Sequence, residues 1–95
     1  MKQTHKDKIK AIRQAARLNI VDIQSIMDII EADIQMAEKR IKEYDAKYEL
    51  TYSQEEKYDE LQDKCSELSD LKENLDEIIT ALEDVVFATD FVEFD

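Results

Sequence analysis

Apolar side chains recur along this sequence at alternating steps of three and four residues. The first row comprises Ile20, Ile23, Met27, Ile30, Ile34, Ala37, Ile41, Tyr44 and Tyr48. A second row repeats leucine every seven residues, at Leu61, Leu68, Leu75 and Leu82. Further apolar residues lie three or four positions from these leucines, at Tyr58, Cys65, Ile79 and Val86. Heptad spacing of this kind places apolar side chains along one stripe of a long α-helix. The two rows therefore predict an all-α fold with coiled-coil-like packing.

The chain contains no glycine and no proline among its 95 residues. Phosphate-binding loops, dinucleotide-binding loops and nucleophile elbows all need glycine, and tight turns between strands favour it. The single cysteine, Cys65, is too few for an internal disulfide or a zinc site, and we expect it to be a small core residue. We therefore expect no enzyme activity, no cofactor and no metal ion.

A short break separates the two rows around residues 49–53. Ser53 and Glu56 have the spacing of a capping box, in which each side chain accepts a hydrogen bond from the backbone N–H of the other residue. We therefore predict one helix over residues 20–48 and a last helix over residues 54–88. A connection this short makes consecutive helices antiparallel neighbours.

Two architectures fit the beginning of the chain. Asn19 is a favourable N-cap residue, and a break there gives a separate helix over residues 4–17 and a three-helix bundle. An apolar seven-residue step from Ile9 to Tyr44 favours instead one continuous helix and a two-helix antiparallel hairpin. Residues 1–95 form a single helical domain in either case. Since two helices alone bury little apolar surface, we expect the hairpin to dimerise into a four-helix bundle.

Charge is distributed unevenly over the chain, whose formal net charge is −11. Residues 1–18 carry six basic residues and one acidic residue, whereas residues 51–95 carry three basic and fifteen acidic ones. An antiparallel hairpin sets the basic beginning beside the acidic end, so we expect Lys10, Arg13 and Arg17 to lie beside residues 84–90. Direct binding of nucleic acid by the basic residues is disfavoured, because the acidic chain as a whole repels phosphate.

The predicted last helix carries many carboxylates on the side away from its apolar row. The acidic side chains expected to contact a partner are Glu56, Asp59, Glu60, Asp63, Glu67, Asp70, Glu73 and Glu77. Their excess is larger than solubility requires, and it destabilises the chain through self-repulsion. It therefore favours a role in binding a basic surface. The charge density of one such helix stays below that of duplex DNA, which carries one charge per about 1.7 Å.

These features favour a small acidic binding protein that inhibits a partner by occupying its basic, nucleic-acid-binding surface, in the manner of a nucleic-acid mimic. The expected partner is a nucleic-acid-handling protein. Compact acidic proteins that block host nucleases or defence complexes are common in mobile elements, so an anti-defence role is suggested by analogy of class alone.

Aromatic residues gather at two places in the sequence. Four tyrosines surround the expected turn, and we expect three of them to pack there, namely Tyr44, Tyr48 and Tyr58. The alternative is an exposed contact surface at the turn formed by Tyr48 and Tyr52.

The second aromatic group belongs to the acidic end of the chain and consists of Phe87, Phe91 and Phe94. These side chains share one helical face. They either cover Ile9 and Ile12, or they form with residues 89–95 an acidic-aromatic tail that docks in a groove of a partner. The alternative function is therefore a coiled-coil structural or adaptor protein that oligomerises and binds a partner through its turn or its tail.

The beginning of the sequence lacks the apolar stretch of a signal peptide. No segment approaches the ~20 apolar residues needed to cross a membrane, and the single cysteine fits a reducing compartment. We therefore expect a cytoplasmic protein with no membrane contact.

Overall fold

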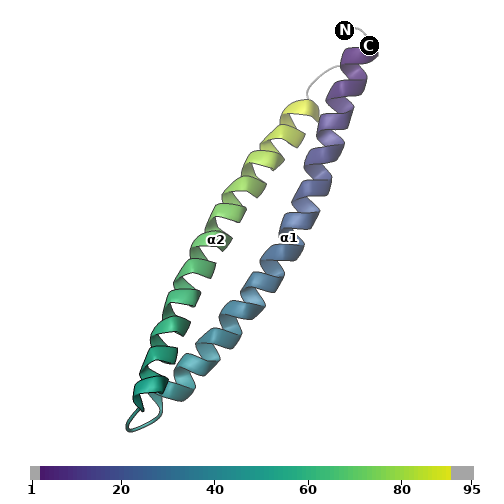
Figure 1. Ribbon diagram of the computed structural model, residues 1–95. Helices are drawn as coiled ribbons and strands as arrows, with labels where there is room; N and C mark the ends of the chain where they lie inside the picture. Colours follow the sequence, from purple (N-terminus) through teal and green to yellow (C-terminus); the bar gives the residue numbers. More distant parts are fainter. Residues whose placement is uncertain (1–2, 91–95) are drawn as a thin grey trace. The chain divides into compact units, whose positions relative to one another are not determined.

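The structure, a computed structural model, describes residues 3–90. Two α-helices make up most of this range: α1 covers Gln3–Asp45 and α2 covers Tyr52–Asp90. They pack as an antiparallel hairpin, and the described range contains no strand (Figure 1). The predicted all-α hairpin is thus confirmed.

Helix α1 passes through Asn19 without interruption, so the alternative with a separate helix over residues 4–17 is wrong. The heptad row instead continues toward the beginning of the chain through Arg13 and Lys6. Lys6 is 7% exposed and Arg13 is half-buried. Long basic side chains can occupy such positions because their alkyl stems pack against apolar neighbours while the charged group reaches a polar partner.

The turn between the helices is closed by a capping box at Thr51 and Gln54. The backbone N–H of Thr51 donates to Gln54 Oε1 at 3.0 Å, and the backbone N–H of Gln54 donates to Thr51 Oγ1 at 3.2 Å. The predicted box at Ser53 and Glu56 is therefore wrong. The earlier start of α2 adds a backbone hydrogen bond from Glu55 N to Thr51 O at 2.9 Å, which a helix beginning at residue 54 would not make.

The hairpin divides into two compact units. The terminal unit contains Met1–Ile26 and Leu75–Asp95, and the turn unit contains Met27–Asn74. Among the described residues, the buried apolar side chains are Ala16 and Ile79 in the terminal unit, and Ile30, Ile34, Ala37 and Leu61 in the turn unit. All but Ala16 belong to the two predicted heptad rows, and Ala16 lies on the apolar seven-residue step from Ile9 to Tyr44. Because the rows fill the interface between the helices, they leave the other faces of each helix exposed.

Candidate functional site

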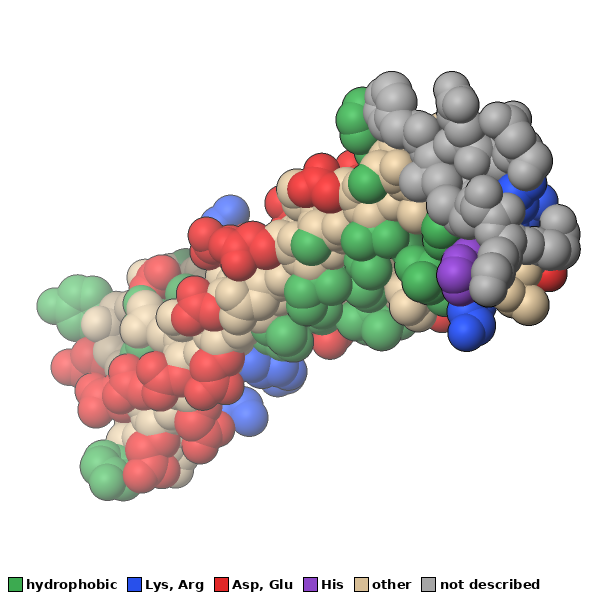
Figure 2. Space-filling model, turned by 90° about the horizontal axis from the view of Figure 1, so that it is seen from above, with side chains coloured by type: hydrophobic (Ala, Val, Ile, Leu, Met, Phe, Trp, Pro, Cys, Tyr) green, Lys and Arg blue, Asp and Glu red, His purple; other side chains and the backbone are tan. Residues whose placement is uncertain are grey.

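The predicted acidic residues lie on the outer surface of α2, away from its buried row. All eight side chains are exposed. Seven belong to the turn unit and are named here the acidic face: Glu56, Asp59, Glu60, Asp63, Glu67, Asp70 and Glu73. The eighth, Glu77, belongs to the terminal unit and is not part of this face. Figure 2 shows acidic side chains gathered densely over one part of the visible surface.

Few basic side chains neutralise the acidic face. Lys57 Nζ lies 3.6 Å from Glu60 Oε2, in an exposed pair on the helix surface. Lys72 is instead directed across to α1, where its Nζ lies 2.5 Å from Glu31 Oε2. The Lys57–Glu60 pair is the one salt bridge of the acidic face among residues 3–90. The face therefore keeps most of its negative charge.

The pair formed by Glu31 and Lys72 links the two helices within the turn unit. Lys72 interrupts the apolar row of α2 at a half-buried position. Its ammonium group donates a hydrogen bond to the Glu31 carboxylate, which balances its charge. The hydrogen bond from Lys72 and its positive charge lower the pKa of Glu31, and Gln35 Nε2 donates a further hydrogen bond to Glu31 Oε1 at 3.4 Å. This pair also explains how a lysine is accommodated among apolar row positions.

Two of the four tyrosines pack at the turn as predicted. The rings of Tyr44 and Tyr58 meet edge to face, with centroids 6.4 Å apart. The Tyr58 hydroxyl donates to Asp45 Oδ1 at 2.8 Å, and this hydrogen bond raises the pKa of Tyr58. The prediction that Tyr48 packs there is wrong, because α1 ends at Asp45 and leaves Tyr48 101% exposed. Tyr52 is 77% exposed, so both tyrosines of the alternative surface are exposed, and a contact with a partner there stays a prediction.

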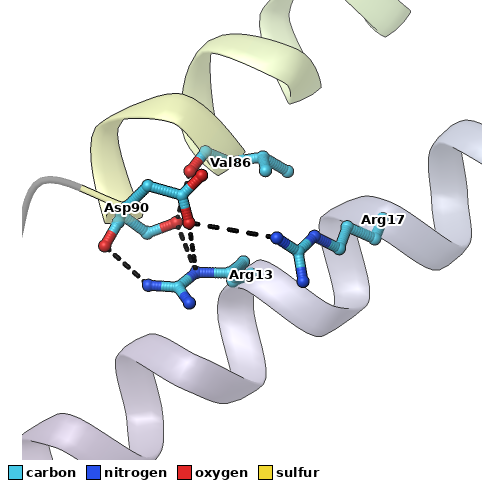
Figure 3. A network of polar contacts seen from close by, with 5 residues as sticks. Arg13, Arg17, Val86 and Asp90 are labelled. Carbon is cyan, nitrogen blue, oxygen red and sulfur yellow. Dashed lines mark hydrogen bonds and ion pairs between the residues drawn. The ribbon is translucent and has the colours of Figure 1, made fainter.

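Within the terminal unit, arginines of α1 meet the end of α2 (Figure 3). Arg13 Nη2 donates to the carbonyl oxygen of Thr89 at 2.6 Å, and Arg13 Nε donates to Thr89 Oγ1 at 3.1 Å. Asp90 Oδ1 lies 3.4 Å from Arg13 Nε and 3.9 Å from Arg17 Nη2. The predicted placement of both arginines beside residues 84–90 is confirmed. These two basic residues therefore contribute to the pairing of the helices.

The predicted aromatic tail is described only at Phe87. This side chain is 65% exposed and lines a shallow groove together with Arg17 and Ile20, while Ile12 stays 54% exposed. Phe87 therefore does not cover Ile12, contrary to that part of the prediction. Phe91 and Phe94 lie outside the described residues.

Cys65 is half-buried rather than fully buried, with its Sγ 4.0 Å from the carbonyl oxygen of Ile34. Within the described range, no group of three or more His, Cys, Asp or Glu side chains is arranged to hold a metal ion. Neither α1 nor α2, over the residues described, has a segment long and apolar enough to cross a membrane.

Comparison with known proteins gives no significant match, whether to a family model, to a curated protein or to a solved structure. The acidic face and the exposed turn are therefore interpreted from their geometry and charge.

Proposed function

We propose that this chain is an acidic helical binding protein whose acidic face occupies a basic, nucleic-acid-binding surface of a partner protein. The observation that supports this function is the concentration of seven exposed carboxylates on one helix surface with one local salt bridge among the described residues. Exposed carboxylates without a basic neighbour are available to pair with lysine and arginine of a partner, which steers association and sets specificity.

The spacing of the acidic face favours a partner that contacts one strand of nucleic acid. Residues 56–73 span about 26 Å of helix at 1.5 Å per residue. The seven carboxylates of the face are therefore spaced by about 4 Å on average along the helix axis. With Lys57 and Lys64 included, the net charge is one per about 5 Å, which is below the one charge per about 3.4 Å of a single DNA strand and further below that of duplex DNA. Occupation of such a surface inhibits the partner, and a host nuclease or defence complex is the class of target that analogy suggests.

A charge-neutralised variant tests the proposal. Four residues of the acidic face are changed in the variant E56Q/E60Q/D63N/E67Q. The matched control, D28N/D33N/E38Q/E43Q, removes the same charge from exposed positions of α1 in the same unit. Each tagged protein is immobilised and exposed to a lysate of the organism that encodes it. Retained proteins are eluted with duplex DNA or with salt and identified by mass spectrometry, and circular dichroism verifies that each variant stays helical.

The proposal predicts that the unaltered chain and the control retain a nucleic-acid-binding protein, whereas the acidic-face variant does not. Both duplex DNA and salt should release this protein from the unaltered chain. The purified partner should then exchange bound DNA for this chain in a mobility-shift assay. Equal retention by the two variants, or a partner that resists both eluants, contradicts a role for the acidic face.

The exposed turn supports a second candidate function, that of an adaptor. Tyr48 and Tyr52 present two large amphipathic side chains to solvent, and tyrosine is enriched at protein interfaces. The variant Y48A/Y52A distinguishes the candidates. An adaptor loses its partner in this variant and keeps it when the acidic face is neutralised, whereas the acidic-face proposal predicts the opposite result.

A further inference from the structure

One flank of the terminal unit is nearly free of charge, although 39% of the residues in the chain are charged. In α1, residues spaced by three and four lie beside the buried row: Ile12, Ala15, Asn19, Asp22 and Ile26, with the exposed Lys8 before them at the same spacing. In α2, the corresponding residues are Ile78, Ala81, Val85 and Ala88. These nine residues are named the side face. Asp22 is its one charged member, and all but the half-buried Val85 are exposed.

The two rows of the side face lie on the same flank of the terminal unit. In an antiparallel helix pair, the positions on one side of each buried row face one another, and the positions on the other side do the same. Arg17 and Asp90, which form a salt bridge, mark one flank. The side-face rows occupy the other flank of both helices. Figure 2 shows hydrophobic side chains gathered together on the visible surface.

The terminal unit buries little apolar surface within itself. Ala16 and Ile79 are its buried apolar side chains in the part of the chain that the structure describes, and neither is fully buried. Meanwhile Ile12, Ile26 and Ile78 are 54%, 49% and 46% exposed. Small helical domains normally gain stability by burying a second stripe of this kind against further helices.

The chain as a whole exposes enough surface to accommodate a dimer interface. Its accessible surface is 7252 Å², whereas a compact folded monomer of 11.2 kDa exposes about 5,700 Å². The difference, about 1,500 Å², is summed over both units and is larger than the about 800 Å² per partner that a stable protein interface of standard size buries.

Charge favours a second copy of this chain as the occupant. A strongly charged partner finds almost no complementary charge on the side face. The described residues of the terminal unit carry seven acidic and five basic side chains, whereas the turn unit carries fifteen and seven. Two terminal units therefore approach one another with little repulsion, despite the net charge of −11.

We propose that two copies of this chain associate through the side face of the terminal unit and complete a four-helix bundle there. The contact is isologous, so the same face serves both copies and each substitution changes the interface twice. In this arrangement Ile12, Ile26 and Ile78 become core residues. The proposal does not depend on the function of the acidic face, which belongs to the turn unit.

Sedimentation velocity of the full chain at micromolar concentrations, in buffer of physiological salt, tests the dimer. The expected mass is twice the 11.2 kDa of the chain. The variant I26E/I78E places four carboxylates in the dimer interface and should sediment as a monomer. The matched control V21E/F87E makes the same change at one apolar residue of each helix, 59% and 65% exposed, on the flank marked by Arg17, and it should stay dimeric.

If circular dichroism shows that I26E/I78E has lost helicity, the milder variant I26A/I78A is tested in its place. It should raise the dimer dissociation constant at least tenfold while remaining folded. A monomeric unaltered chain overturns the proposal and leaves the side face to another protein. If I26E/I78E remains a dimer, or if the control loses the dimer equally, the contact does not lie on the side face and the proposal is also overturned. The acidic-face variant should remain dimeric, which separates this result from that of the proposed function.

Discussion

Arg13 in α1 and Thr89 in α2 are joined by two hydrogen bonds, although they are 76 residues apart in the sequence. One of these bonds satisfies the carbonyl oxygen of Thr89, which lies in the last turn of α2, where carbonyl groups have no partner within the helix. The guanidinium group also lies beside the Asp90 carboxylate. Arg13 therefore stabilises the end of α2 and holds it against α1.

Replacement of Arg13 by alanine should lower the free energy of unfolding by about 1–2 kcal/mol, since it removes hydrogen bonds from a charged donor at a half-buried position. Arg17 is the matched control. Its side chain is 53% exposed and its salt bridge is 3.9 Å long, so R17A should cost less than about 0.5 kcal/mol. Urea unfolding at one fixed protein concentration measures both values. Equal losses would show that Arg13 acts through general charge alone.

The pair formed by Glu31 and Lys72 predicts a pH-dependent contribution to stability. The hydrogen bond from Lys72 lowers the pKa of Glu31 in the folded chain. A carboxyl with a lowered folded pKa stabilises the protein fully above its unfolded pKa, about 4.3 for glutamate, and loses this effect as the pH falls through the folded pKa. E31Q should therefore be less stable than the unaltered chain at neutral pH and equally stable in strong acid.

Urea unfolding at both pH values checks this expectation. E38Q is the control, because Glu38 is exposed on the same helix and forms no salt bridge among the described residues. A stability difference for E31Q that is the same at both pH values contradicts the salt-bridge explanation and indicates a loss of packing instead.

The heptad rows predicted the fold well because a buried stripe is a property of the sequence pattern itself. Each buried apolar residue in the described range lies in those rows or on the seven-residue step from Ile9 to Tyr44. The residues of the acidic face are exposed because they lie on the side of α2 opposite to its row. The continuity of α1 at Asn19 was harder to predict. A favourable N-cap contributes only about 1 kcal/mol, and the choice depends on whether Arg13 and Lys6 find partners across the hairpin, which the sequence of α1 alone does not show.

The ends of the helices at the turn were also difficult to predict. Thr51–Gln54 and Ser53–Glu56 both have capping-box spacing, and the structure uses the pair that adds a helical hydrogen bond. The exposure of Tyr48 follows from the earlier end of α1. Helix boundaries depend on such small local differences in energy, whereas the rows depend on many residues together.

The hydrogen bond between Tyr58 and Asp45 predicts a tyrosine that ionises late. The pKa of Tyr58 is raised because its phenol donates a hydrogen bond to the Asp45 carboxylate. This bond stabilises the folded chain below the unfolded pKa of tyrosine, about 10, and the effect is lost as the pH rises through the folded pKa. In the background Y44F/Y48F/Y52F, Tyr58 is the one remaining tyrosine. Ultraviolet absorbance should show its titration shifted to higher pH, and D45N should lower the midpoint. An unchanged midpoint in D45N contradicts the hydrogen bond.

The capping box at the turn makes a prediction that separates two neighbouring hydroxyl groups. Thr51 Oγ1 accepts the backbone N–H of Gln54, whereas Ser53 lies inside the first turn of α2 and is exposed. T51A should therefore lower the free energy of unfolding by about 1 kcal/mol, and S53A should change it by less than about 0.5 kcal/mol or raise it slightly, because alanine is the better helix former. Urea unfolding of the two variants compares them directly. A larger loss in S53A than in T51A would move the start of α2 to residue 54 and shift the first turn of the helix that carries Glu56.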